Sequence, residues 1–208
     1  MPQSHVTPDS AAGARVSDPA PIGLSLFGFG LLLYAVNFIW VEKSVVGLDY
    51  ALLIGGLALV LAGIISVVGG LAYSGYVMTT FGFWAIGLYF LLTSGIQNRA
   101  FAPEAVGWYC LGMLVPVAYL AIPAIKYRMY PFVALFASLF GVLACMGMGQ
   151  INTDQDLVKT SGWFALFASA LVWSVAAYSV LVNTGVLTQA APSPRVPAAS
   201  LPVEKATA

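Results

Sequence analysis

Six long apolar runs dominate this sequence, and each is long enough to cross a membrane. They cover residues 22–41, 48–69, 77–97, 105–125, 131–149 and 162–187. A helix of about 20 residues spans the roughly 30 Å hydrocarbon core of a bilayer. Backbone polar groups in that core must be bonded within the segment, so runs of this length become helices. The sequence therefore predicts an all-α fold: a polytopic membrane protein with a bundle of six transmembrane helices.

Charged residues are few, and their placement supports the same prediction. Only 8% of the chain is charged, about a third of the share in an average soluble domain. The eight basic and eight acidic side chains lie outside the six runs or at their ends. The net charge is zero, and no Lys/Arg cluster occurs. The lipid bilayer is thus an expected partner and nucleic acid is not.

The residues that usually carry catalysis or hold metals are scarce. The single histidine, His5, lies in a polar N-terminal stretch, and Cys110 and Cys145 stand alone in apolar runs. No metal-ligand spacing and no nucleophile–base pair is visible. No enzymatic activity, metal or cofactor is expected. No charged residue or histidine lies deep in a run, whereas proton relays usually need one there.

The distribution of Lys and Arg predicts the orientation of the chain. With six spans, both ends of the chain share a side. That side carries five basic residues and the other carries three: Arg15, Lys126, Arg128, Arg195 and Lys205 against Lys43, Arg99 and Lys159. The positive-inside rule then places both termini in the cytoplasm, with the spans in the cell (inner or plasma) membrane. We expect disordered cytoplasmic tails over 1–20 and 189–208 around a membrane domain over 21–188.

A stripe of small residues runs along the second apolar run. Its members recur at four-residue spacing: Ala58, Ala62, Ser66 and Gly70. Such a stripe lets another helix backbone approach closely. The pattern predicts either helix packing within the chain or an interface between subunits, and it leaves both open.

Two prolines interrupt the fourth run. Pro116 and Pro123 each remove the hydrogen bond to the carbonyl four residues earlier, at Gly112 and Tyr119. A kink is the simpler prediction. A hinge or a path-lining role is the alternative, because a freed carbonyl in a membrane needs another partner.

A proline-rich motif opens the first run, where residues 18–24 read Asp-Pro-Ala-Pro-Ile-Gly-Leu. It resembles the Asn-Pro-Ala-Pro-Leu-Gly-Leu signature of the acetate uptake transporter family, whose bacterial members include the succinate–acetate permease. The residues that carry this likeness are Asp18, Pro19, Ala20, Pro21, Gly23 and Leu24. Further similar stretches follow in the family's order: Gly55-Gly56-Leu57, Ala62-Gly63-Ile64, Thr79 to Trp84, and Ser161-Gly162-Trp163 running on to Asn183.

The resemblance implies six-helix subunits that assemble as homo-hexamers, each with its own path for acetate and similar short acids. In the family this path narrows at a hydrophobic constriction made by an aromatic, a tyrosine and a leucine. The first position falls on Phe27, or on Phe29 with a two-residue shift. The second falls on Phe81, which lacks the hydroxyl, and the third falls near Ala137, Ser138 or Leu139. The implied function is a permease or channel for acetate or other small monocarboxylates.

Several polar positions of the family are changed here. The leading Asn is Asp18, a Gln is replaced by Leu59, a Glu by Ser66 and an acidic residue by Phe164. Groups that could couple a proton to the solute are therefore missing, and passive or weakly coupled transport of a small organic acid is expected. The alternatives are a urea or short-chain amide channel, and a non-transporting membrane sensor or assembly subunit.

Overall fold

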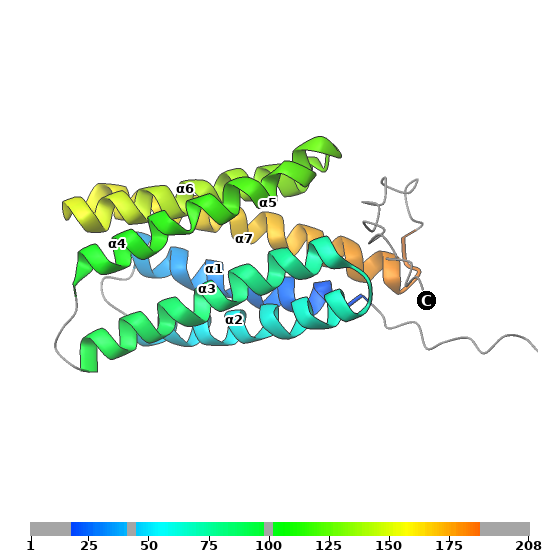
Figure 1. Ribbon diagram of the computed structural model, residues 1–208, viewed down its shortest axis with the longest axis horizontal. Helices are drawn as coiled ribbons and strands as arrows, with labels where there is room; N and C mark the ends of the chain where they lie inside the picture. The colour runs from blue at the N-terminus through cyan, green and yellow to red at the C-terminus, as the bar shows by residue number, and fades with distance from the viewer. Residues whose placement is uncertain (1–17, 41–44, 98–101, 188–208) are drawn as a thin grey trace, which may run out of the picture.

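The computed structural model describes residues 18–40, 45–97 and 102–187. This part of the chain forms seven helices (Figure 1): α1 (Ala20–Ile39), α2 (Val45–Val68), α3 (Ala72–Gln97), α4 (Pro103–Gly112), α5 (Leu114–Lys126), α6 (Tyr130–Asn152) and α7 (Gln155–Asn183). With α4 and α5 taken as one segment, six segments are long and apolar enough to cross a membrane. The predicted six-helix membrane bundle is confirmed.

The helices form a ring in which each pass runs antiparallel to its neighbours. In the ring, α1 packs between α2 and α7, α3 packs on α2, and α6 packs on α7, α4 and α5. Contact between α3 and the α4–α5 segment is much sparser. The chain thus returns to its starting end after the sixth pass, and the ring has one weakly closed seam, between α3 and α4–α5.

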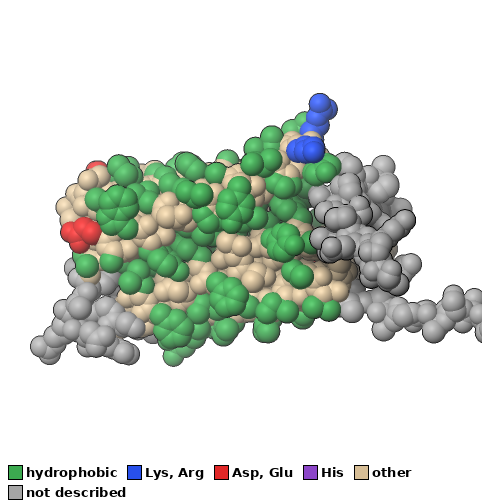
Figure 2. Space-filling model, in the orientation of Figure 1, with side chains coloured by type: hydrophobic (Ala, Val, Ile, Leu, Met, Phe, Trp, Pro, Cys, Tyr) green, Lys and Arg blue, Asp and Glu red, His purple; other side chains and the backbone are tan. Residues whose placement is uncertain are grey.

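Charges lie at the two ends of the bundle. Figure 2 shows acidic side chains at the end where α4 begins, and Lys and Arg at the opposite end. By their places in the chain, Glu104 lies in the first turn of α4, whereas Lys126 ends α5 and Arg128 follows it. The long sides between the ends are covered mainly by apolar side chains, as a lipid-facing surface requires.

All six passes begin before the predicted apolar runs, and two of them, α3 and α7, begin at least five residues earlier. Helix α7 starts at Gln155 rather than at residue 162, because Asp154 caps it. The Asp154 carboxylate accepts hydrogen bonds from the backbone N–H groups of Asp156 and Leu157, at 3.0 and 3.2 Å. Helix α3 starts at Ala72 rather than 77. Hydropathy misses such first turns, whereas in α7 the capping residue Asp154 reveals it.

The predicted tails lie almost entirely outside the described residues. Their inner boundary differs by one residue at the start, because Ala20 already begins α1. At the other end, α7 stops at Asn183, and the described chain continues to Leu187.

The fourth pass is broken into α4 and α5 at Met113. Pro116 has no N–H to donate to the Gly112 carbonyl, and the helix is interrupted directly after Gly112. Pro123 also lacks this donor, yet it lies inside the continuous helix α5. Of the two prolines, Pro116 therefore lies next to the interruption.

Hydrogen bonds tie α1 to α7. The Ser169 hydroxyl donates to the Gly28 carbonyl at 2.7 Å, and the Trp173 indole donates to the Ser25 carbonyl at 2.9 Å. Such interhelical bonds replace the hydrophobic effect, which does not drive helices together in lipid. They hold α1 against α7, and Phe27 of α1 is buried.

Candidate solute path

Three phenylalanines from three helices meet inside the ring. The ring centroid of Phe27 on α1 lies 6.1 Å from that of Phe81 on α3, which lies 6.3 Å from that of Phe136 on α6. Their exposed fractions are 8%, 3% and 3%. These separations are typical of aromatic pairs in contact, so the three rings form one apolar cluster across the bundle.

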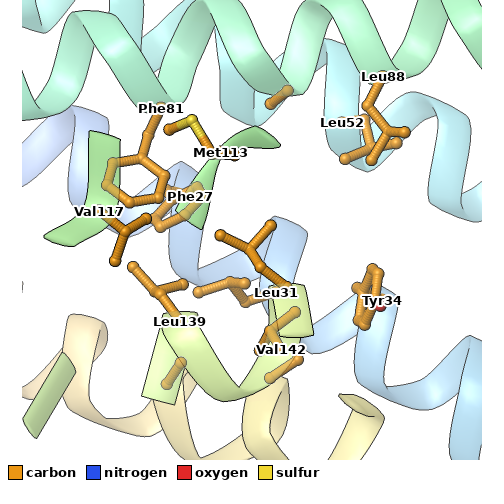
Figure 3. Packing of buried hydrophobic residues seen from close by; sticks show 14 of the residues in the cluster. Phe27, Leu31, Tyr34, Leu52, Phe81, Leu88, Met113, Val117, Leu139 and Val142 are labelled. Carbon is orange, nitrogen blue, oxygen red and sulfur yellow. The ribbon is translucent and has the colours of Figure 1, made fainter. Parts of the chain in front are cut away.

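Aliphatic side chains complete this cluster. Figure 3 shows Val117 and Leu139 close to the Phe27 and Phe81 rings, with Met113 on the other side of Phe81. Leu139 comes from α6, three residues after Phe136, so both project from the same helix face. Met113 and Val117 flank the start of α5, which means that the interruption of the fourth pass lies beside the cluster.

Two cavities lie on either side of this cluster. We call the cavity next to Asp18 and Tyr73 the terminal cavity, and its volume is about 160 Å³. The distal cavity, next to Tyr34 and Trp84, measures about 40 Å³. Three side chains line both cavities: Phe27, Phe81 and Leu139. A water molecule needs about 10–15 Å³ of such space, so either cavity can hold water or a small solute.

The terminal cavity carries the more polar lining. Its polar side chains are those of Asp18, Tyr73, Ser74 and Ser179, and Asp18 is the one charged group among its described lining residues. The remaining lining is apolar, contributed by α1, α2, α3, α6 and α7. This cavity suits a small solute with a polar group at one end.

The distal cavity has two polar side chains in its described lining, Tyr34 and Trp84. The Ser161 hydroxyl donates to the Val158 carbonyl at 2.6 Å, which leaves the Tyr34 hydroxyl to donate to Ser161 at 2.9 Å. The Trp84 Nε1 atom is buried and has no hydrogen-bond partner among the described residues. The indole ring itself stacks on Tyr109, with centroids 6.1 Å apart.

The signature motif shapes the beginning of α1. The Asp18 carboxylate accepts a hydrogen bond from the Ala20 backbone N–H at 2.9 Å, and Pro19 precedes the first helical residue. Pro21 is buried in the first turn. Further on, Leu24 joins Asp18 and Ala20 in lining the terminal cavity. The motif therefore starts the helix and contributes one wall of this cavity.

The small stripe of α2 lies inside the chain. Ala62 and Ser66 are 3% and 0% exposed. A methyl group added at Gly23 would lie 2.8 Å from the Ala62 Cβ and 3.4 Å from the Ala58 carbonyl oxygen. Gly70 is not part of the stripe, because α2 ends before it and its φ of +82° is left-handed. Ala58 and Ala62 of the stripe therefore pack against α1 of the same chain.

The alternative positions for the family's constriction lie elsewhere. Phe29 is 41% exposed and lines neither cavity. Ala137 is also exposed, whereas the Ser138 hydroxyl donates to the Ala134 carbonyl of its own helix at 2.8 Å. Of the sequence candidates, Phe27, Phe81 and Leu139 are the ones that the fold brings together.

Among the described residues, no three His, Cys, Asp or Glu side chains are grouped to hold a metal ion. Cys110 is buried and Cys145 half-buried, and neither is in a disulfide.

Comparison with known proteins decides the family. Residues 3–202 match the GPR1/FUN34/yaaH family. The chain belongs to this family. The resemblance to the acetate uptake transporter family is thereby confirmed.

This chain is similar to two known proteins. The meiotically up-regulated gene 86 protein of Schizosaccharomyces pombe (strain 972 / ATCC 24843) is 29% identical over 170 residues, which cover 75% of this chain and 56% of that protein. The chain thus spans a little over half the length of this curated relative. A solved structure of the bacterial acetate channel SatP superposes with a TM-score of 0.76 at 20% identity, covering 84% of this chain and 98% of that one. The two share the fold.

Phe136, Val117 and Tyr73 were not among the residues selected from the sequence. Phe136 could have been found, because it precedes Leu139 by one helical turn on the same face. Val117 and Tyr73 give no such signal, since their places depend on how α5 packs against α3. The sequence pattern of a single helix does not contain that information.

Proposed function

We propose that this protein is a passive or weakly coupled membrane channel for acetate or another small monocarboxylate, and not an enzyme. One observation carries the proposal: Phe27, Phe81 and Leu139 separate two cavities that lie along the axis of the bundle. The similarity in fold to a bacterial acetate channel supports the same function. The family's pattern of a hydrophobic constriction agrees with these three positions.

The proposed constriction selects by dehydration and size. A carboxylate or an ion that keeps its water shell does not pass between packed aromatic rings, and removing that shell in an apolar site is costly. A short acid exposes little polar surface and has a small cross-section. We therefore expect acetate to pass readily and longer or more strongly hydrated solutes to pass slowly.

The proposed orientation places both termini in the cytoplasm of a cell with the bundle in its inner or plasma membrane. The basic end of the bundle, with Lys126 and Arg128, then faces the cytoplasm. The terminal cavity then lies toward this side, and the distal cavity lies toward the outer side.

We further propose a homo-hexamer, as the family resemblance implies, with one path per subunit. Because Ala62 and Ser66 are buried within the chain, subunit contacts must use other positions. Native mass spectrometry in mild detergent tests the number of subunits. A hexamer is expected, and a monomer under every detergent condition would contradict it.

A swelling assay on proteoliposomes tests the proposed function. Vesicles with purified protein are compared with empty vesicles in isotonic acetate, butyrate, acetamide and urea. We expect protein-dependent swelling that is fastest in acetate. Faster swelling in urea or acetamide than in acetate would favour an amide channel, and no protein-dependent swelling in any solute would favour a non-transporting role.

A further inference from the structure

The seam between α3 and the α4–α5 segment is bridged by two tyrosines that point in opposite directions. Tyr109 of α4 donates its hydroxyl to the Trp84 carbonyl of α3 at 2.9 Å. Tyr73 of α3 donates to the Leu120 carbonyl of α5 at 2.7 Å. Backbone packing at this seam is otherwise sparse. The closure of the ring therefore depends largely on side chains, which can move more readily than packed helices.

An outward-facing cleft of about 460 Å³ lies at this seam, on the side of Tyr73. Hydroxyl-bearing side chains line it to an unusual extent for a membrane-facing surface: Tyr73, Tyr76, Thr79, Thr80 and Tyr119. Tyr76 and Tyr119 are 58% and 53% exposed. Polar groups are costly against hydrocarbon, so the lining points to a cleft that holds water or a hydrogen-bonding solute.

A backbone carbonyl beside the cleft lacks its usual helical donor. Pro123 lines it and has no N–H for the carbonyl of Tyr119, which lies one turn earlier on the same helix. The hydroxyl groups can donate hydrogen bonds and the carbonyl can accept one. A carboxylic acid and a primary amide both carry a donor and an acceptor on one small functional group, so either ligand matches this lining.

Tyr73 is the side chain that separates the cleft from the interior. It lines both the outer cleft and the terminal cavity, and its hydrogen bond to Leu120 holds it across the seam. We propose that the cleft is a side entrance to the terminal cavity for small carboxylic acids or amides, with Tyr73 as the side chain that opens and closes it. This inference rests on the proposed function and adds to it a second binding site and a lateral route.

Thiol modification tests the side entrance. Cys110 and Cys145 are first replaced by alanine, and Thr80→Cys or Ile122→Cys is then introduced into that parent protein. Thr80 lines the cleft, whereas Ile122 of α5 is 59% exposed and lies outside it. Each protein is reconstituted, treated with a water-soluble methanethiosulfonate reagent, and assayed for labelling and for acetate flux.

We expect Thr80→Cys to be labelled, to be protected by high acetate or acetamide, and to lose at least five-fold in flux after labelling. The flux of Ile122→Cys should not change. Removing the bridging hydroxyl by Tyr73→Phe should raise flux about two- to ten-fold, since the net contribution of one hydrogen bond corresponds to a change of that order.

Three results would overturn the inference. An unlabelled Thr80→Cys would mean that lipid or a second subunit fills the cleft, and labelling without loss of flux would mean that the solute does not use it. Both outcomes leave the proposed function intact if the parent protein transports. A parent protein without flux would instead remove the proposed function, and the side entrance with it.

Discussion

Gly23 of α1 and Ala62 of α2 meet so closely that a methyl group added at Gly23 would lie 2.8 Å from the Ala62 Cβ. Contact at this distance leaves no room for a larger side chain on either helix. The start of α1, which carries the signature motif and one wall of the terminal cavity, is therefore placed by its packing on α2.

Enlarging this contact should destabilise the protein. We expect Ala62→Leu to lower the free energy of unfolding by about 1–3 kcal/mol or more, because the added atoms force the two backbones apart. Ala170→Leu is the control, since Ala170 lies on the exposed face of α7. Thermal unfolding in detergent measures both, and equal melting temperatures would contradict the close packing of α1 and α2.

The hydrogen bond from Ser169 to the Gly28 carbonyl gives a second prediction. Ser169→Ala should cost about 0.6 kcal/mol of stability, the average for interhelical hydrogen bonds in membranes, and at most about 1.7 kcal/mol. Ser174→Ala removes a hydroxyl that bonds only to the Ala170 carbonyl of its own helix and should cost much less. Equal losses of stability in the two variants would show that the hydrogen bond from Ser169 to Gly28 does not itself stabilise the packing of α1 on α7.

Pro116→Ala tests the interruption of the fourth pass. Alanine supplies the N–H that the Gly112 carbonyl lacks, so α4 and α5 should join and move Met113 and Val117 relative to Phe81. We expect slower hydrogen exchange around Gly112 and a several-fold change in flux. Pro131→Ala is the control, because a proline at a helix start costs no hydrogen bond; an equal effect there would argue against the interruption as the cause.

Cysteine labelling tests the proposed orientation. A membrane-impermeant reagent should label Asp156→Cys in intact cells, since residue 156 lies in the exposed first turn of α7. Arg195→Cys should be labelled only after the cells are made permeable. The opposite labelling pattern would show that the termini face outward, against the proposed orientation.

The sequence predicted the six passes because each one is a long apolar segment, and length and hydropathy are properties of a single segment. It also predicted Phe27, Phe81 and Leu139, through the family resemblance rather than through any property of these residues. It did not predict the first turns of α7, which are polar, or the interruption at Met113 as distinct from a kink. The Tyr73–Leu120 bridge joins residues 47 positions apart and depends on the packing of whole helices.

Phe81→Ala tests the central claim most directly, in proteoliposomes with equal amounts of folded protein. Truncating a buried phenylalanine costs about 3–5 kcal/mol of stability, so the amount of folded protein must be matched. Phe83→Ala is the control, since Phe83 is 59% exposed on the same helix. If Phe81 closes the path, its loss should raise acetate uptake and increase butyrate uptake relative to acetate several-fold, with Phe83→Ala unchanged. A Phe81→Ala protein with an unchanged rate and an unchanged butyrate-to-acetate ratio would contradict the account.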